Sequence, residues 1–238
     1  MASFSSRGPN LLLPEIIKPD VRAPGVDILA AYIPIASISC SQDDKRHLNY
    51  SILSGTSMSC LHAAGAAAYM KEVHPDWSPA AIKSSPMTTA WAINITNKNN
   101  APGEFANGSG HINPIQAINL GLVYEAFKED YKKLLCLVIG KEKVRLISRD
   151  NNTTCPTGSD TGSPWDHNYP SLAVVVTPME PFSIKFERIV KNVGLPNSTY
   201  KANILATSTY KANFTQFNIK VLPQVLSLES LNEEIEDL

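Results

Sequence analysis

Apolar positions are spaced for helices along much of the first 140 residues. A nearly unbroken run of small apolar residues predicts a helix over residues 57–73. Ser78 followed by Pro79 predicts the start of a second helix, because serine is a favoured N-cap and proline suits the first helical position. Residues 115–121 predict a short helix that ends at a glycine. Residues 128–139 carry apolar side chains at the spacing of an amphipathic helix.

Strand patterns lie on both sides of these helices. Residues 26–30 are a short apolar run next to turn residues, which predicts a buried strand. Toward the C-terminus the apolar period changes to two, and residues 182–187 and 217–221 predict half-buried strands. Between the two patterns, residues 141–165 are rich in Ser, Thr, Asn and Asp and are the expected linker.

Pro86 interrupts the pattern of the second predicted helix. A proline inside a helix loses one backbone hydrogen bond and clashes with the preceding turn, at a cost of about 3 kcal/mol. The sequence therefore predicts one of two outcomes. Either the helix ends near Ser84, or the protein is less stable than relatives with a helix-forming residue at this position.

Composition narrows the function classes. Lys and Arg number 21 against 22 Asp and Glu, a balance that gives no argument for nucleic acid or an anionic membrane. No apolar run approaches the roughly 20 residues of a membrane span, and the N-terminus has no signal-peptide pattern. We expect no cofactor and no metal, because the cysteines are widely spaced and form no C-x-x-C pair. Free thiols are the default expectation, with one disulfide as the alternative, for Cys40, Cys60, Cys136 and Cys155.

A small-residue turn places one serine at the start of the alanine-rich helix. In the sequence Gly55-Thr56-Ser57, glycine permits a tight turn and the approach of a substrate carbonyl. Unpaired N–H groups at a helix N-terminus can stabilise a developing oxyanion, which is what an acyl-transfer nucleophile needs. The plain alternative is a buried helix whose Thr or Ser is only the N-cap.

Further blocks decide between these interpretations. They are FSSRGPN at residues 4–10, KPDVRAPGVDILA at 18–30, MTTA at 87–90, GSGHINP at 108–114, GLVY at 121–124, NYPS at 168–171 and VKNVG at 190–194. Together with the serine turn, and in the same order, they resemble the plant (cucumisin-like) branch of the subtilisin-like serine proteases. The resemblance extends to about residue 228.

The resemblance implies an α/β fold with two domains. Residues 1–140 would be the C-terminal part of a subtilisin-like catalytic domain with a parallel sheet, and residues 141–165 the linker. Residues 166–238 would form a truncated, all-β fibronectin-III-like sandwich, since such a sandwich needs about seven strands.

The resemblance also assigns the chemistry. Ser57 matches the nucleophile, its backbone N–H would lie in the oxyanion hole, and Gly55 and Thr56 would support the turn. In subtilisin the catalytic residues follow the order Asp, His, Ser. This sequence contains no H-G-T-H block, and its single D-[ST]-G triplet, at residues 160–162, follows the serine instead of preceding it. We therefore expect the Asp and His blocks upstream. Loss of the base alone costs on the order of 10⁶ in turnover, so this chain alone is predicted to be inactive.

Two function classes remain open from the sequence. The chain is part of a serine endopeptidase with a polypeptide substrate, once an upstream half completes it. Alternatively, it is a truncated, non-catalytic fragment or a protein-interaction module that uses its β-sandwich.

His62 lies five residues after Ser57 and is a tempting general base. Residues at i and i+5 on a helix are about 140° apart, because each residue turns about 100°, so the two side chains should diverge. We expect His62 not to be the base. None of the other histidines sits in a motif that would direct it at Ser57, namely His47, His74, His111 and His167.

N-x-S/T triplets, which are N-glycosylation acceptors, indicate the cellular compartment in which the protein is expected. They begin at Asn49, Asn94, Asn107, Asn151, Asn152, Asn197 and Asn213, which makes these residues glycosylation candidates. Their density suits a secreted plant glycoprotein, and the family resemblance implies an extracellular (apoplast) location. The chain as written carries no signal peptide, so the two observations conflict.

Overall fold

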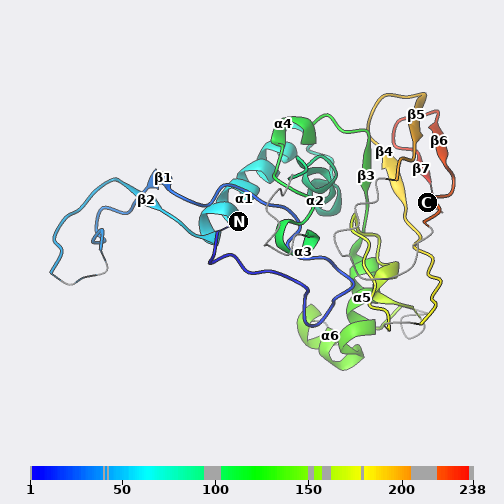
Figure 1. The fold of residues 1–238 in the computed structure, drawn as a ribbon, viewed down its shortest axis with the longest axis horizontal. Helices are drawn as coiled ribbons and strands as arrows, with labels where there is room; N and C mark the ends of the chain where they lie inside the picture. The colour runs from blue at the N-terminus through cyan, green and yellow to red at the C-terminus, as the bar shows by residue number, and fades with distance from the viewer. Residues whose placement is uncertain are drawn as a thin grey trace.

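A helical core lies between a projecting two-stranded ribbon and a group of small sheets (Figure 1). The computed structural model describes residues 2–39, 41, 43–93, 103–149, 153–156, 162–177, 180–204 and 219–235. Within these ranges, no helix is both long enough and apolar enough to cross a membrane.

Helix α1 (Thr56–Val73) forms where the alanine-rich run predicts it. Its inner side buries Ala66 and Met70 against Ile112 and Ala117, the latter in the short helix α4 (Pro114–Ala117). Small side chains on α1 let its backbone approach these neighbours closely. The predicted helix over residues 115–121 is therefore present but shorter, because the chain turns into strand β3 (Leu122–Tyr124).

Helix α2 (Pro79–Thr88) starts as predicted. The Ser78 hydroxyl accepts a hydrogen bond from the Ala81 amide at 3.0 Å. The helix continues through Pro86, so the expectation that it ends near Ser84 is wrong. Ser84 is buried, and its hydroxyl binds the Ala81 carbonyl and the Tyr124 amide, so the last turns of α2 are held by tertiary contacts.

Three further helices accompany α1, α2 and α4. The glycine-rich loop after residue 103 contains the single turn α3 (Glu104–Asn107). Helix α5 (Lys128–Ile139) has the predicted bounds. Helix α6 (Lys141–Ser148) occupies the start of the segment expected to be a linker, and a 3-10 turn (Pro164–Asp166) lies at its end. The segment is therefore partly ordered by its own helical turns.

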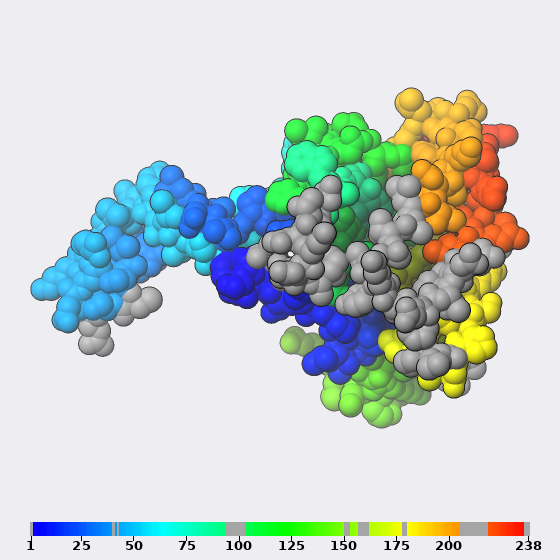
Figure 2. All heavy atoms as spheres, in the orientation of Figure 1, coloured from blue at the N-terminus to red at the C-terminus, as the bar shows by residue number. Residues whose placement is uncertain are grey.

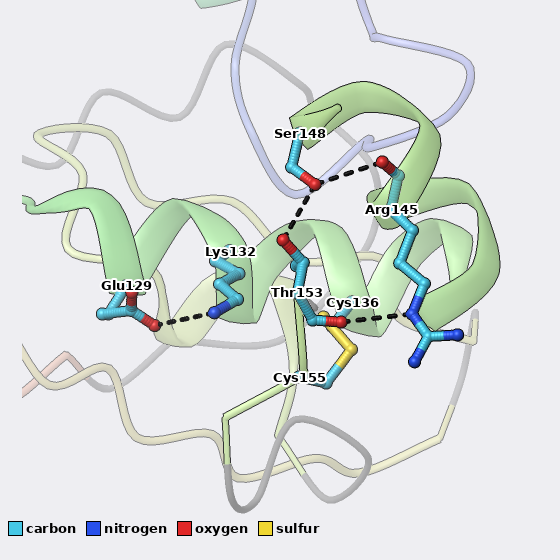
Figure 3. The surroundings of a disulfide bond; sticks show 7 residues. All are labelled: Glu129, Lys132, Cys136, Arg145, Ser148, Thr153 and Cys155. Carbon is cyan, nitrogen blue, oxygen red and sulfur yellow. Dashed lines mark hydrogen bonds and ion pairs between the residues drawn. A yellow bond between two sulfur atoms is a disulfide. The ribbon is translucent and has the colours of Figure 1, made fainter. Parts of the chain in front are cut away.

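A disulfide joins Cys136 of α5 to Cys155, whose Cα atoms are 5.9 Å apart (Figure 3). The default expectation of free thiols is wrong for this pair. The disulfide brings the chain after α6 back to α5. Two contacts hold the same segment to α6, since Arg145 Nε donates to the Thr153 carbonyl at 3.3 Å and the Ser148 and Thr153 hydroxyls are 2.9 Å apart. Cys60 is a free, exposed thiol, and Cys40 lies outside the described residues.

The ribbon consists of β1 (Ile28–Ala31) and β2 (Tyr50–Leu53), which pair antiparallel with Leu29 opposite Ile52. The strand predicted over residues 26–30 is therefore present, but it is largely exposed and not buried. Within the described ranges all named strands pair antiparallel. The parallel sheet implied by the family resemblance is not seen there, apart from one isolated parallel bridge between Arg22 and His111.

Two small sheets form the opposite side of the molecule (Figure 1). The first has the order β3-β4-β7, with β4 (Val190–Asn192) between β3 and β7 (Glu234–Ile235). The second pairs β5 (Ser198–Lys201) with β6 (Val225–Leu228). Val190, Leu226 and Leu228 form their buried core.

The expected all-β sandwich is only partly visible. Residues 182–187 form no strand although apolar and polar residues alternate there. Phe186 instead packs beneath the Arg188 guanidinium, 5.7 Å from the ring centroid. Residues 219–221 form no strand either, and residues 217 and 218 lie outside the described ranges. Because β3 pairs with β4, one sheet joins the two predicted domains, whose boundaries stay a prediction.

Replacing Pro86 tests the cost of the proline inside α2. We expect Pro86→Ala to raise the free energy of unfolding by about 1–2 kcal/mol, because residue 86 then donates its amide to the Ile82 carbonyl. The gain is smaller than the full interior cost, since proline also restricts the unfolded chain. Urea denaturation measures it. Pro79→Ala is the control and should change stability by less than about 0.5 kcal/mol. Equal effects of both changes would contradict the explanation.

The disulfide should carry a large share of the stability around α5 and α6. The bonded cysteines are 19 residues apart, and a loop of about this size is worth about 3 kcal/mol. We expect Cys155→Ser to lower the free energy of unfolding by that amount, measured by urea denaturation without reductant. Cys60→Ser, at an exposed thiol, should change it by less than about 0.5 kcal/mol. An unchanged wild-type denaturation midpoint after reduction would refute the prediction.

Candidate functional site: a serine at a helix N-terminus

Ser57 lies in the first turn of α1, and its side chain is exposed. Among the described residues no group hydrogen-bonds its hydroxyl, and the amides of Thr56 and Ser57 have no backbone acceptor. Met58 is the first amide of the helix that is paired, to the Gly55 carbonyl at 3.2 Å. Two free N–H groups at the positive end of the helix dipole therefore lie next to a free hydroxyl.

The two glycines near this turn play different parts. Gly55 has φ 170°, an extended conformation open to any residue, and an added Cβ would lie 3.4 Å from Met58 Sδ. Its backbone angles therefore do not require glycine. At Gly25 a Cβ would come within 2.1 Å of Ser59 Oγ and 2.8 Å of the Gly55 carbonyl. Gly25 is the glycine that the serine turn needs, which the sequence analysis missed although the residue lies in one of the matching blocks.

A single extended segment, residues 18–25, holds the start of α1 and is called the strap below. The Gly55 amide donates to the Gly25 carbonyl at 2.7 Å, and Ser59 Oγ donates to the Ala23 carbonyl at 3.0 Å. In its middle, Arg22 exchanges backbone hydrogen bonds with Gly110 at 2.7 Å and Ile112 at 2.8 Å. The strap thereby fixes where the serine turn sits relative to the helical core.

The other end of the strap is tied to Tyr169 of the NYPS block. Lys18 Nζ lies 2.7 Å from Asp20 and 2.8 Å from the Tyr169 hydroxyl, which in turn donates to Asp20. Burial, together with the hydrogen bond to Asp20, holds the pKa of Tyr169 above its usual value. The phenol therefore stays a donor at neutral pH, and this polar cluster joins the second part of the chain to the strap.

Tyr169 is itself held by two side chains that bind backbone carbonyls. Arg188 is buried, and its Nε donates to the Tyr169 carbonyl at 2.9 Å. Asn168 Nδ2 donates to the carbonyls of Glu125 at 2.7 Å and Ile189 at 2.8 Å. Burial lowers the pKa of Arg188. The NYPS block is thus a structural joint between the two parts of the chain.

His62 is turned back onto its own helix, with Nδ1 2.9 Å from the Met58 carbonyl. No hydrogen bond joins it to Ser57, in agreement with the expectation that it is not the base. The His74 ring stacks on Trp77 at 3.9 Å, and its Nε2 contacts the Ile118 carbonyl at 2.9 Å.

The remaining histidines are also placed away from this chemistry. His111 stacks with Trp91, His47 is exposed in the ribbon loop, and His167 is buried beside Tyr131. Burial lowers the pKa of His167. Within the described residues the site therefore holds an exposed serine hydroxyl and amide donors but no base in contact with that hydroxyl. No group of three or more His, Cys, Asp or Glu side chains in those ranges could hold a metal ion.

The glycosylation candidates differ in their surroundings. Asn49 and Asn197 are exposed, and Asn197 has φ 57° in a turn. Asn107 is buried, and its Oδ1 accepts a hydrogen bond from Arg22 at 3.0 Å. The other candidates lie outside the described residues, namely Asn94, Asn151, Asn152 and Asn213.

Removing the Tyr169 hydroxyl tests the link between the NYPS block and the serine turn. We expect Tyr169→Phe to lower the free energy of unfolding by about 1–2 kcal/mol, because the charged Asp20 carboxylate loses the hydrogen bond that the Tyr169 hydroxyl donates to it. Hydrogen exchange should quicken in peptides that contain Gly55 and Ser59. Tyr131→Phe is the matched control, because no described residue hydrogen-bonds the Tyr131 hydroxyl, and it should leave both readouts unchanged. Unaltered exchange at the serine turn in Tyr169→Phe would argue against the link.

Comparison with known proteins agrees with this arrangement. Residues 1–111 match the model of the subtilase family, and residues 166–236 match the model of a fibronectin type-III domain. Among Arabidopsis thaliana proteins, the subtilisin-like proteases SBT4.4 and SBT4.6 are both 48% identical to this chain, and SBT4.3 is 46% identical. Each alignment covers 98% of this chain, which spans 31% of the relative's length. On these matches residues 1–111 are a subtilase-family segment, and the chain as a whole is similar to plant subtilisin-like proteases over nearly all of its residues.

Proposed function

We propose that Ser57 is the nucleophile of a serine endopeptidase whose Asp and His come from another polypeptide segment, and that this chain alone does not cleave peptide bonds. The observation that carries the proposal is the exposed hydroxyl at the N-terminus of α1, beside free amides and without a histidine in contact. A serine hydroxyl is a weak nucleophile until a base takes its proton.

The chemistry of the completed site follows from the position of Ser57. With a histidine beside it, Oγ attacks the scissile carbonyl of a polypeptide, and the proton passes to the imidazole. The carbonyl oxygen becomes an anion, which the Ser57 amide at the start of α1 can stabilise by hydrogen bonding. The histidine proton then goes to the leaving amine, and water releases the acyl group from Ser57 by the reverse sequence.

The second candidate is a non-catalytic, truncated fragment or a protein-interaction module. The absence of a base in contact with Ser57 among the described residues favours it for the isolated chain. The two candidates differ in whether Ser57 can be activated by an added segment.

We also propose the domain limits and the location that the family suggests. Residues 1–140 would be catalytic, 141–165 a linker and 166–238 fibronectin-III-like, although α6 and the β3–β4 pairing make the junction a packed one. The density of N-x-S/T triplets supports an extracellular glycoprotein, and the exposure of Asn49 and Asn197 makes them the best acceptors within the described ranges.

A fluorophosphonate probe tests whether Ser57 is activated in the chain alone. We expect the folded wild type to be labelled no more than Ser57→Ala, because the loss of the base removes on the order of 10⁶ in rate. In-gel fluorescence after timed labelling measures this, with an active subtilisin as the positive control. Labelling of the wild type that disappears in Ser57→Ala would contradict the claim of inactivity and require a base within this chain.

A further inference from the structure

His167 is buried at the place where α5 meets the NYPS block. It directly precedes that block and is only 8% exposed. Its ring contacts two tyrosine rings, with centroids 4.9 Å away for Tyr131 of α5 and 6.2 Å away for Tyr169. The N-terminal segment also packs here, since Leu13 and Leu134 line the apolar cluster of Tyr169. Figure 2 shows the blue, light green and yellow segments together in the lower half of the view.

Positive charges already surround this imidazole. The Arg188 guanidinium donates to the carbonyls of Trp165 and Tyr169, two residues before and two residues after His167, each at 2.9 Å. Lys83 Nζ of α2 lies 5.3 Å and 6.0 Å from the centroids of the same two tyrosine rings. Neither ring nitrogen of His167 has a hydrogen-bond partner in the described part of the chain. A proton on His167 would therefore add a third positive charge to an enclosed site.

The other charged groups around these rings come from four elements. They are Lys18 and Asp20 of the strap, Glu125 after β3, Asp130 of α5 and Asp166 of the 3-10 turn. Asp130 is the carboxylate that favours a proton on His167, but its Oδ2 already accepts a hydrogen bond from the Phe127 amide at 2.7 Å. Asp20 is likewise paired, with Lys18 and the Tyr169 hydroxyl. Among the described residues no carboxylate hydrogen-bonds the imidazole.

The closed site disfavours the charged form of His167. Burial lowers the pKa of His167 most, Asp130 raises it, and Lys83 and Arg188 lower it further. The same crowding lowers the pKa of Lys83, through burial and through Lys18. When the site opens, His167 regains an ordinary pKa of about 6.5. Above that pH both forms are neutral, whereas below it the open form binds the proton more readily, so that acid favours opening.

We propose that His167 is a pH-sensitive switch, in which a proton from solvent drives the ring out of its site, opens the contact between the NYPS block and the strap, and loosens the start of α1. Tyr169 lies two residues after His167, and its hydroxyl donates to Asp20 of the strap. The strap in turn holds the Gly55 amide through the Gly25 carbonyl at 2.7 Å. The switch does not depend on the proposed function, because it acts on the position of the serine turn and not on its chemistry.

Hydrogen exchange of the full chain tests the switch. Exchange is followed by mass spectrometry at about pH 7.5 and about pH 5.5 and is corrected for the intrinsic effect of pH. In wild type we expect the opening of peptides from residues 18–25 and 165–171 to increase by up to about tenfold in acid. That limit applies to a group with a pKa of about 6.5 when open and no proton when closed.

Variants of the ring identify the group that responds. His167→Leu and His167→Gln bind no proton and should lose the increase in opening. His47→Gln is the matched control at an exposed histidine and should keep it. An equal increase in wild type and both His167 variants overturns the proposal. An increase confined to residues 165–171 also overturns it, because the strap is then not released.

An NMR titration of the histidine Cε1 protons needs only the wild-type chain. We expect one of the five imidazoles to titrate below the ordinary pKa of about 6.5, because the closed site resists the proton. Loss of that signal in His167→Gln assigns it. If all five histidines titrate at or above about 6.5, the proposal is wrong even where neither variant folds.

Discussion

The contact between Gly25 and the start of α1 is the constraint on which the serine turn depends. The Gly55 amide reaches the Gly25 carbonyl at 2.7 Å, and a Cβ on Gly25 would lie only 2.1 Å from Ser59 Oγ. A substitution there would push the strap away from the helix. Since the strap also binds Gly110 and Ile112, the position of Ser57 is set by backbone hydrogen bonds rather than by its own side chain.

Polar joints connect the two parts of the chain around the strap, beside an apolar cluster of Ile16, Met87 and Tyr169. Tyr169 donates to Asp20, and Arg188 donates to the carbonyls of Trp165, before the NYPS block, and Ser171, at its end. Buried donors of this kind keep their partners because leaving one unpaired costs free energy. The first residues of the fibronectin-III-like part consequently support the segment that positions Ser57.

The start of α1 is built by near neighbours, whereas contacts to it and to the ribbon depend on distant segments. A helix N-terminus can be built by local sequence, so the amide donors and the serine are present together in α1. A base and the strands that cover a ribbon must come from distant parts of a polypeptide. In the described ranges neither is provided, since no histidine contacts Ser57 and β1 pairs only with β2.

Local features of this protein were determined by the sequence alone. The alanine run specifies α1, Ser78-Pro79 specifies the start of α2, and the spacing of residues 128–139 specifies α5, because helix geometry and caps depend on near neighbours. The motif blocks likewise identified the family resemblance and placed Ser57 in the block that matches its serine motif.

Tertiary structure decided the rest. In the folded structure α2 continues past Pro86, and Cys136 is bonded to Cys155. Residues 182–187 form no strand, and the ribbon is exposed. Only the structure shows that Gly25 packs closely against the start of α1 and that Tyr169 links the second part of the chain to the strap. Each of these outcomes depends on which distant segments meet, and neither periodicity nor local propensity contains that information.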